Sequence, residues 1–582
     1  MKTNRPVLFI SISCSFYVLI LCWFAYSYER GAIDRELFFN ADALYFPSLF
    51  KNIFLEGKHF SDWVLAPQLY LFPDALLYAA AYILSKNVFT QMLIFAILQS
   101  ILFSYLVSTL LSFFIRRSNA ISYSALISSN IILLSLYSTD PFGLSFLAGF
   151  HFGSLLSFLI LSFLLLKFNS ASSIKEKYYV GSLTVFLAAC SAISDRLILI
   201  QFIAPILLVG IYYSYTGTKS KDILKFAILL VIGYLLALIL GKIFLPEMGS
   251  LQYGIGLGSI SDKSMMLANW VIGRPVLIQL SLMLFPVTLY IALLFLHQNV
   301  SDTDQRVSQR RLFAYLILVS IALMLLVTGL SDRDFTPRYL LPFLFLPPVF
   351  LFILLSENKS RMLAFILCVS SCSAIFASHE KENIPVPFYT FYPDFVRCVD
   401  ELAQRHGVSR GIAQYWDAIP LYVLSNVGLN VVPVIDDGSP MRFAFNNSDF
   451  SGEFSFAVID NNATGIYKIS RTAIERLLAK KPFEYRCYNK TVLIFNNETI
   501  ALPRQSALAD IRNSALESFI RNPRALLIMA QEESGKGNQP AAVRLLSEAI
   551  ILLRQSGASE DTIRYYESVK EKYQSTNNHG YH

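Results

Sequence analysis

The chain has 582 residues, of which 54% are hydrophobic and only 15% are charged. So low a charged fraction excludes an ordinary soluble protein and is typical of a chain with many membrane-spanning helices. The formal net charge of +7 does not indicate nucleic-acid binding, because the surplus lysines and arginines lie in short breaks between apolar stretches, where they orient a membrane protein.

Apolar stretches of about 20 residues, the length that crosses the hydrocarbon core as a helix, recur along the first two thirds of the chain. They predict a polytopic α-helical membrane protein. About eleven transmembrane helices are expected. They would cover residues 6–26, 88–115, 119–137, 142–167, 178–194, 197–215, 223–245, 275–296, 312–330, 339–355 and 362–377. A further apolar run, Pro73 to Leu84, has only about a dozen residues and is predicted to lie at the membrane surface.

Basic residues cluster in every second break, and such clusters favour the cytoplasmic side. If the N-terminus is cytoplasmic, the following clusters all face that side: Arg116 and Arg117; Lys167, Lys175 and Lys177; Lys219, Lys221 and Lys225; Arg306, Arg310 and Arg311; Lys359 and Arg361. The odd number of spans then leaves the chain beyond Ser378 outside. The sequence therefore predicts a multi-pass protein of the inner (plasma) membrane, with residues 1–377 in the membrane part and a periplasmic C-terminus.

Residues 378–504 are predicted to form a small α/β domain on the outer side, because helical patterns alternate there with runs rich in branched residues. The expected helices cover 393–405, 417–426 and 469–480, and the expected strands cover 411–416, 429–434, 454–460, 483–488 and 491–496. Asn489-Lys490 separates the last two strands as a hairpin turn would. Cys398 and Cys487 lie in this domain, where a disulfide is allowed, but the sequence does not show whether they meet.

Residues 505–582 change to a purely helical pattern, with helices expected at 506–520, 523–536, 540–555 and 559–574. The stretch 537–550 resembles one tetratricopeptide unit and would be a docking site for a protein partner. Its small-large-small packing positions are Ala542, Leu546 and Ala549, with Ala530 on the partner helix. Only one unit matches, whereas a repeat array needs about three, so a helical hairpin packed on the α/β domain explains the pattern equally well.

The first predicted outer loop, residues 27–87, carries the densest set of polar residues: Asp34, Arg35, Glu36, Asp42, Lys51, Glu56, Lys58, His59, Asp62 and Asp74. Asp42 differs from the rest because aromatic and aliphatic residues flank it in FFNADALYFPSLF. A carboxylate seated in such surroundings is a good proton acceptor. The alternative is a helix cap, since Asp before an apolar helical run is a common helix start, and the residue pattern does not decide between them.

Other polar residues lie at the outer ends of the predicted spans. Asp140, before Pro141, could hold a metal or orient a substrate, or it could be a turn residue. His151 lies between the glycines of GFHFG, about one third of the way into its predicted span, and is more typical of a buried, hydrogen-bonded histidine than of a ligand. Asp195 and Arg196 could neutralise one another or face lipid headgroups. Several arginines at this face could hold a phosphate in a bidentate way or extend to headgroups: Arg196, Arg274, Arg333 and Arg338.

This layout resembles the C-type fold (GT-C) of integral-membrane glycosyltransferases that use polyprenyl-phosphate sugars, such as the aminoarabinose transferases of lipid A and the protein O-mannosyltransferases. In that family the acidic residue of the first outer loop is the proposed general base, and Asp42, within NADALY, is the matching position. The segment LYLFPDALLY, with Pro73 and Asp74, resembles the start of the family's interfacial helix. The segment TPRYLLP, with Arg338 and Tyr339, resembles a recurring RY-containing stretch. The Asp-Glu pair of the O-mannosyltransferases is absent, since Ala43 follows Asp42, which leaves the substrate class open.

The resemblance implies a transferase with Asp42 as the base, assisted by Asp74 or Asp140. The implied substrate-binding residues are Arg338, Tyr339, His151, Arg196 and Arg274. No cofactor is expected beyond a candidate divalent metal near Asp42 and Asp140, and the implied partners are a polyprenyl-phosphate-linked sugar and membrane lipids. The chain has no P-loop and no nucleotide-binding GxGxxG, as a lipid-linked donor would allow.

Two other classes of function remain open. A transporter or flippase of a lipid-linked glycan would carry ionisable groups near the middle of the membrane, and the predicted spans are nearly free of them. A non-catalytic scaffold for envelope assembly would act through the helical tail and would not need a carboxylate-rich first loop.

Overall fold

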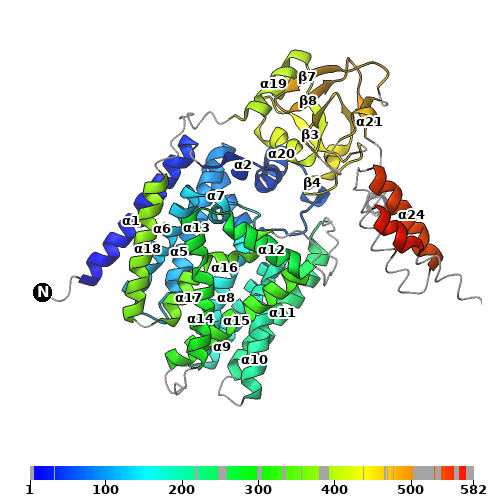
Figure 1. Ribbon diagram of the computed structural model, residues 1–582. Helices are drawn as coiled ribbons and strands as arrows, with labels where there is room; N and C mark the ends of the chain where they lie inside the picture. Colours follow the sequence, from blue (N-terminus) through cyan, green and yellow to red (C-terminus); the bar gives the residue numbers. More distant parts are fainter. Residues whose placement is uncertain are drawn as a thin grey trace, which may run out of the picture. The chain divides into compact units, whose positions relative to one another are not determined.

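The structure, a computed structural model, describes most of the chain. The described residues are 5–31, 33–216, 221–246, 259–297, 305–330, 336–355, 357–378, 392–436, 438–463, 467, 469–475, 478–502, 530, 539–555 and 563–571. The chain divides into two compact units: Met1–Asn462 with Ile469–Ile500, and Ala463–Lys468 with Ala501–His582. Figure 1 shows the helices and strands and labels most of the helices.

Within the described residues, seven helices are long and apolar enough to cross a membrane. They are α1 (Arg5–Arg30), α5 (Val88–Leu111), α6 (Arg117–Tyr137), α8 (Phe152–Ser170), α11 (Lys221–Phe244), the continuous pair α13 (Val276–Leu282) and α14 (Leu284–His297), and α15 (Gln305–Leu330). The prediction of a multi-pass helical membrane protein is therefore confirmed. Each of the seven coincides with one of the predicted spans.

The other four predicted spans are also helical but less suited to crossing alone. Two are long helices with more polar residues: α9 (Ile174–Ser194) and α18 (Glu357–Ser378). Two are shorter: one consists of η5 (Leu199–Ile203) and α10 (Ala204–Tyr215), the other of η6 (Pro337–Leu340), α16 (Leu341–Phe345) and α17 (Pro347–Leu354). A count of eleven spans therefore stays a prediction.

The predicted span 142–167 is wrong at its start. Helix α8 begins only at Phe152, and the preceding residues form α7 (Thr139–Phe142), η4 (Gly143–Phe146) and a loop. Gly149 and His151 in this loop have φ values of +80° and +66°, which a right-handed helix does not allow. Helix α12 (Ser259–Ile272) was not predicted at all, because its apolar run is short and interrupted by charges.

Contacts at one end of the helix bundle join segments that carry the basic clusters. An Arg310 Nη donates to the carbonyl oxygen of Phe114 at 3.4 Å, and Lys177 pairs with Asp222 at 2.5 Å. Gln309, next to Arg310, donates to Ser170 at 3.1 Å. Helix α8, with 19 residues, separates Ser170 from the other end of the bundle by about 28 Å. The clusters at 116–117, 167–177, 221–225 and 306–311 thus share one side, as the charge pattern requires.

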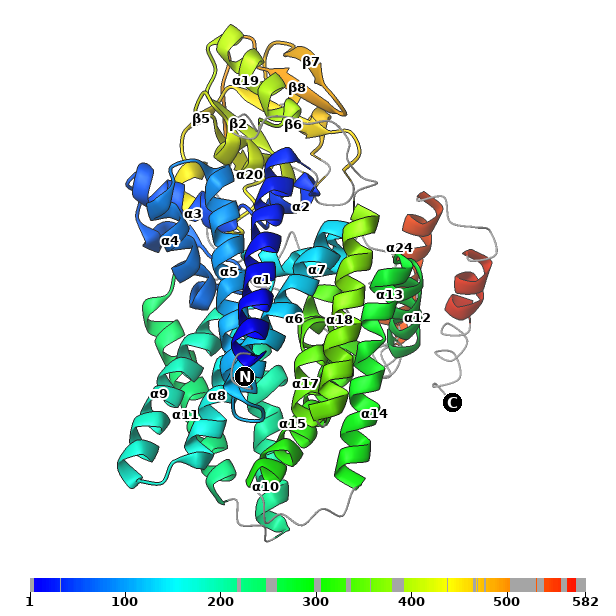
Figure 2. The same cartoon turned by 90° about the vertical axis from the view of Figure 1, so that its left-hand side faces the viewer.

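The opposite end carries the first loop and the α/β region (Figure 2). The loop contains α2 (Arg35–Phe38), α3 (Tyr45–Phe50), η1 (Lys51–Leu55), η2 (Phe60–Asp62), β1 (Trp63–Val64), η3 (Leu71–Ala75) and α4 (Leu76–Leu84). Strand β1 pairs in an antiparallel way with β4 (Phe445–Asn446) of the α/β region. The helix over 71–84 is apolar but shorter than the candidate spans, in keeping with a segment at the membrane surface.

The α/β region has a five-stranded sheet in the order β3-β2-β6-β8-β7. Its elements are α19 (Asp394–His406), β2 (Arg410–Ala413), α20 (Tyr415–Leu424), β3 (Asn430–Pro433), η9 (Asn447–Phe450), β5 (Glu453–Phe454), β6 (Phe456–Asp460), α21 (Arg471–Glu475), β7 (Phe483–Cys487), β8 (Lys490–Ile494) and β9 (Ile500–Ala501). Strands β3, β2 and β6 are parallel, and β8 runs antiparallel to β6 and β7. The predicted alternation of strands and helices is confirmed, including the hairpin β7–β8.

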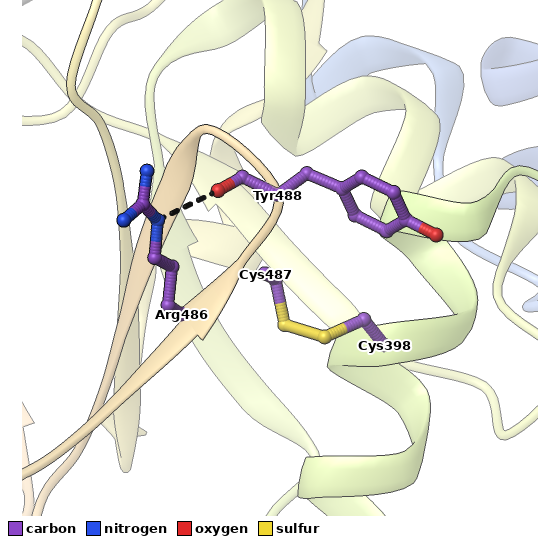
Figure 3. Close-up of a disulfide and its surroundings, with 4 residues drawn as sticks. All are labelled: Cys398, Arg486, Cys487 and Tyr488. Carbon is purple, nitrogen blue, oxygen red and sulfur yellow. Dashed lines mark hydrogen bonds between the residues drawn. A yellow bond between two sulfur atoms is a disulfide. The ribbon is translucent and has the colours of Figure 1, made fainter.

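Cys398 of α19 and Cys487 of β7 form a disulfide (Figure 3). The bond joins a helix to an edge strand of the sheet, across 5.8 Å between the two Cα atoms. Disulfides persist outside the reducing cytoplasm, so the bond is consistent with an extracytoplasmic α/β region.

In the second unit the structure describes α24 (Gln539–Gln555) and a helix over residues 563–571. The proposed packing residues Ala542, Leu546 and Ala549 are buried, as is Ala530. The expected helices 506–520 and 523–536 lie outside the described residues, apart from Ala530. The tetratricopeptide resemblance stays a prediction.

Candidate functional site

Asp42 lies where three distant segments of the chain meet. An Arg338 Nη atom donates to Asp42 Oδ2 at 3.3 Å, and the Tyr415 hydroxyl donates to Asp42 Oδ1 at 3.4 Å. The side chains of Asp42 and Arg338 keep 27% and 32% of their surface exposed. A carboxylate and a guanidinium therefore face each other within reach of a substrate.

The Asp42 carboxylate does not cap a helix. Helix α3 begins after Leu44 and has no side-chain cap, and the turn before it is closed by Asn40, whose Oδ1 accepts the Ala43 N–H at 2.9 Å. The helix-cap alternative is therefore wrong, because the start of α3 has no side-chain cap and the Asp42 carboxylate contacts the side chains of Arg338 and Tyr415 instead.

Asp74 is fully buried beside the loop before α8. The Gly149 N–H donates to its Oδ2 at 3.3 Å, while Oδ1 has no hydrogen-bond partner among the described residues. A Cβ on Gly153 would lie 2.3 Å from Oδ1, so a side chain at position 153 would force the carboxylate to move. Burial raises the pKa of Asp74 to about 7, against the lowering effect of the Gly149 hydrogen bond. A Cβ on Gly149 would lie 3.6 Å from the Asp42 carbonyl oxygen, so this loop touches both aspartates.

His151 forms a second buried cluster with Asp195 and Tyr70. Its Nδ1 lies 2.7 Å from Asp195 Oδ2, its Nε2 lies 3.3 Å from the Tyr70 hydroxyl, and the Tyr339 ring packs against it at 5.3 Å. The expectation of a buried, hydrogen-bonded histidine holds. Its predicted place inside a span was wrong, because His151 precedes α8 in a left-handed conformation.

The two residues that follow α9 do not neutralise one another. Asp195 contacts His151, whereas the Arg196 side chain is exposed and its backbone N–H donates to Gln68 Oε1 at 3.1 Å. This alternative for the pair is therefore wrong.

The remaining predicted residues are Arg274, Asp140 and Arg333. Arg274 donates to the Trp270 carbonyl at 3.2 Å and stacks over its ring, at the end of α12. The backbone of Asp140 lies in α7, but its side chain is outside the described residues, as is all of Arg333.

The described residues contain no group of three or more His, Cys, Asp or Glu side chains that could hold a metal ion. Asp42 has arginine and tyrosine as partners, and the side chain of Asp140 is not described.

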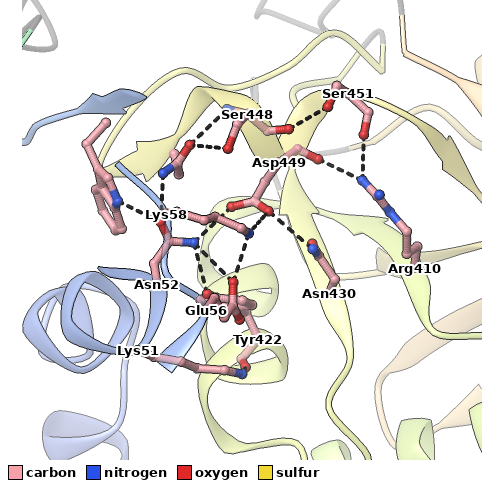
Figure 4. A network of polar contacts seen from close by, with 12 residues as sticks. Lys51, Asn52, Glu56, Lys58, Arg410, Tyr422, Asn430, Ser448, Asp449 and Ser451 are labelled. Atoms are coloured by element: carbon pink, nitrogen blue, oxygen red, sulfur yellow. Dashed lines mark hydrogen bonds and ion pairs between the residues drawn. The ribbon is translucent and has the colours of Figure 1, made fainter. Parts of the chain in front are cut away.

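A polar network joins the first loop to the α/β region (Figure 4). Lys58 pairs with buried Asp449, Asn52 donates to both Asp449 and the Tyr422 hydroxyl at 3.1 Å, and Lys51 donates to the Tyr422 carbonyl at 2.5 Å. The network holds α20, and with it Tyr415, against the loop that carries Asp42.

Sequence reasoning missed Tyr70 and Tyr415. Tyr415 is 373 residues away from Asp42 along the chain, and no spacing signal connects two residues so far apart. Tyr70 sits in the first loop, but nothing in its neighbourhood distinguishes it from the many other aromatic residues there.

No protein-family model, no curated protein and no solved structure matches this chain. The resemblance to the C-type glycosyltransferases therefore rests on the layout and the quoted segments alone.

Proposed function

We propose that this protein is a membrane glycosyltransferase that moves a sugar from a polyprenyl-phosphate donor to an acceptor hydroxyl at the outer membrane surface. The observation that supports it most directly is the Asp42–Arg338 pair, a carboxylate and a guanidinium 3.3 Å apart. The pair belongs to the end of the bundle opposite the basic clusters, where a lipid phosphate in the outer leaflet would lie.

The pair suits the two charge changes of this reaction. Asp42 takes the proton of the acceptor hydroxyl while the acceptor oxygen forms a bond to the anomeric carbon of the sugar. The bond from that carbon to the phosphate oxygen breaks, and polyprenyl phosphate leaves with the bonding electrons. Arg338 stabilises the charge that develops on this phosphate.

The Arg338 guanidinium can bind a phosphate in addition to the Asp42 carboxylate. Its Nε is buried and has no hydrogen-bond partner among the described residues, and an unpaired buried donor is costly. A donor phosphate would satisfy this N–H and compete with Asp42 for the guanidinium. Donor binding would thereby release the carboxylate to act as a base.

The test is turnover of radiolabelled polyprenyl-phosphate sugars by the full-length protein in lipid nanodiscs. Asp42→Asn should lower the rate about 100- to 10,000-fold and should not weaken donor binding, because the phosphate no longer competes with a carboxylate for Arg338. Arg338→Lys should weaken donor binding first, because lysine keeps the charge and loses the bidentate geometry. Arg397→Gln, which removes an exposed arginine of α19, is the matched control and should behave as wild type.

Wild-type turnover by Asp42→Asn would refute the assignment of the base. If the wild-type protein transfers no sugar but moves a lipid-linked sugar across the bilayer of proteoliposomes, the protein is a transporter and not a transferase.

A further inference from the structure

Helix α20 brings two neighbouring aromatic residues of the α/β region to the Asp42 carboxylate. Tyr415 is buried and donates to Asp42, whereas Trp416 keeps 41% of its surface exposed. The two rings meet edge to face, 5.4 Å between centroids. The indole therefore lies one tyrosine ring away from the proposed base.

Helix α20 is held from two sides, near its C-terminal end and in its first turn. On one side Lys51 of the first loop contacts both the carbonyl and the ring of Tyr422. On the other side Lys490 of the β7–β8 hairpin pairs with buried Asp417 at 2.8 Å. Gln414 also closes the helix start, since its side chain accepts the Trp416 N–H at 2.9 Å. The position of Trp416 relative to Asp42 is thus fixed by the fold.

We infer that Trp416 is the platform for a carbohydrate acceptor, so that the hydroxyl that receives the sugar belongs to a glycan. This inference rests on the proposed transferase function and adds the acceptor class to it. An indole offers a flat apolar face and one N–H donor, which suits a sugar ring with its C–H face and its hydroxyls. A ring stacked on Trp416 presents a hydroxyl past Tyr415 to the Asp42 carboxylate.

A tryptophan at the membrane surface can instead anchor a protein among lipid headgroups. Trp416 belongs to helix α20, which contacts strand β3 of the sheet and is fixed to the first loop, and it adjoins the residue that contacts Asp42. These contacts favour the carbohydrate over the lipid as its partner.

The test is saturation-transfer NMR on the full-length protein in nanodiscs. The probes are a hexose, an N-acetylhexosamine, a 6-deoxyhexose and their β-linked disaccharides. At least one of them should receive saturation from the wild-type protein, and Trp416→Ala should weaken its binding about tenfold. Trp416→Tyr, which keeps an aromatic face, should retain most of the binding.

The matched control is Tyr488→Asn. Tyr488 is an exposed aromatic residue of the same region, at 57% exposure and φ +60°, and asparagine tolerates that backbone conformation. It should bind the saccharides as wild type does. The inference is refuted if no saccharide binds, or if Trp416→Ala binds saccharides as wild type does. It is also refuted if the two proteins differ only in the quenching of their tryptophan fluorescence by brominated lipids, which would show that Trp416 contacts lipid.

The binding readout is separate from catalysis. Asp42→Asn should retain saccharide binding while it loses transfer. If saccharides bind at Trp416 but no polyprenyl-phosphate donor is turned over, the proposed transferase fails while the glycan site stands; if transfer proceeds but depends on a non-carbohydrate acceptor, only the present inference fails.

Discussion

Three aspartates of the candidate site lie in three different environments. Asp42 is partly exposed and faces a guanidinium, Asp74 is buried with a single backbone donor, and Asp195 is buried against His151. Carboxylates held in unlike surroundings take unlike roles. Asp42 is placed for the proposed base, while Asp74 has a raised pKa and is buried against the loop before α8.

Asp74 makes the stability of the protein depend on pH. Its pKa rises from the usual 3.8 to about 7 in the folded protein, so the folded state holds a proton that the unfolded chain has already lost. Stability therefore falls as the pH rises from about 4 to 7, by up to about 1.4 kcal/mol per pH unit, and changes no further above that range. Asp74→Asn should remove this part of the pH dependence.

The measurement is the thermal midpoint of wild type and Asp74→Asn in the same nanodiscs between pH 5 and 8. Other titrating groups are shared, so the difference between the two curves isolates Asp74. Parallel curves for the two proteins would contradict the assignment of a proton to Asp74 at pH 6.

Helix packing in the membrane part relies on glycine where backbones approach closely. A Cβ on Gly233 of α11 would lie 2.6 Å from the Val185 carbonyl oxygen and 2.8 Å from the Ala188 Cβ of α9. A Cβ on Gly241 of the same helix would meet only the Leu245 side chain, at 3.7 Å. Both glycines lie in α11, but only Gly233 is in close contact with another helix.

Alanine at these two glycines should therefore have opposite effects. Gly233→Ala should destabilise the protein by about 1 to 3 kcal/mol, because α9 and α11 must move apart. Gly241→Ala should be neutral or stabilise by up to about 1 kcal/mol, because alanine favours the helix. Thermal unfolding in nanodiscs measures both, and equal effects would show that α9 and α11 do not touch at Gly233.

The association of the first loop with the α/β region depends on a buried carboxylate. Asp449 accepts from Lys58, Asn52 and Asn430, and β1 pairs with β4 beside it. Asp449→Asn removes the charge and should raise the opening equilibrium of this contact about 30-fold, corresponding to about 2 kcal/mol.

Hydrogen exchange of the backbone amides in β1 and β4 measures this opening. Asp394→Asn, which breaks an exposed pair with Arg397, is the control and should stay within about 0.5 kcal/mol of wild type. Unchanged protection in Asp449→Asn would show that the β1–β4 pairing holds the two parts together without the ion pair.

The orientation of the whole molecule gives a further prediction. Segments that carry basic clusters contact one another at one end of the bundle, and the disulfide lies in the α/β region. A reporter that is active only in the cytoplasm should therefore be silent when fused after Tyr392. Strong reporter activity would place the Asp42–Arg338 pair on the cytoplasmic side and refute the proposed use of an outer-leaflet donor.

The sequence by itself predicted a multi-pass helical membrane protein with a mixed α/β region, and it marked Asp42 and Arg338 as candidate site residues. It did not predict that Tyr415 and Trp416 begin α20, since they were expected in a strand. Such predictions follow from hydropathy, periodicity and local context, which are properties of residues close together in the sequence. The start of α8 was mispredicted for the same reason, since residues 142–151 are apolar yet include the left-handed Gly149 and His151.

Only the tertiary structure decided which of these residues meet. Asp42 and Arg338 are 296 residues apart along the chain, Asp42 and Tyr415 are 373 apart, and Cys398 and Cys487 are 89 apart. Asp195 pairs with His151 and not with Arg196, its neighbour in the sequence. Such pairs depend on how helices pack and where the α/β region is held, and a pattern that repeats every two or 3.6 residues carries no information about either.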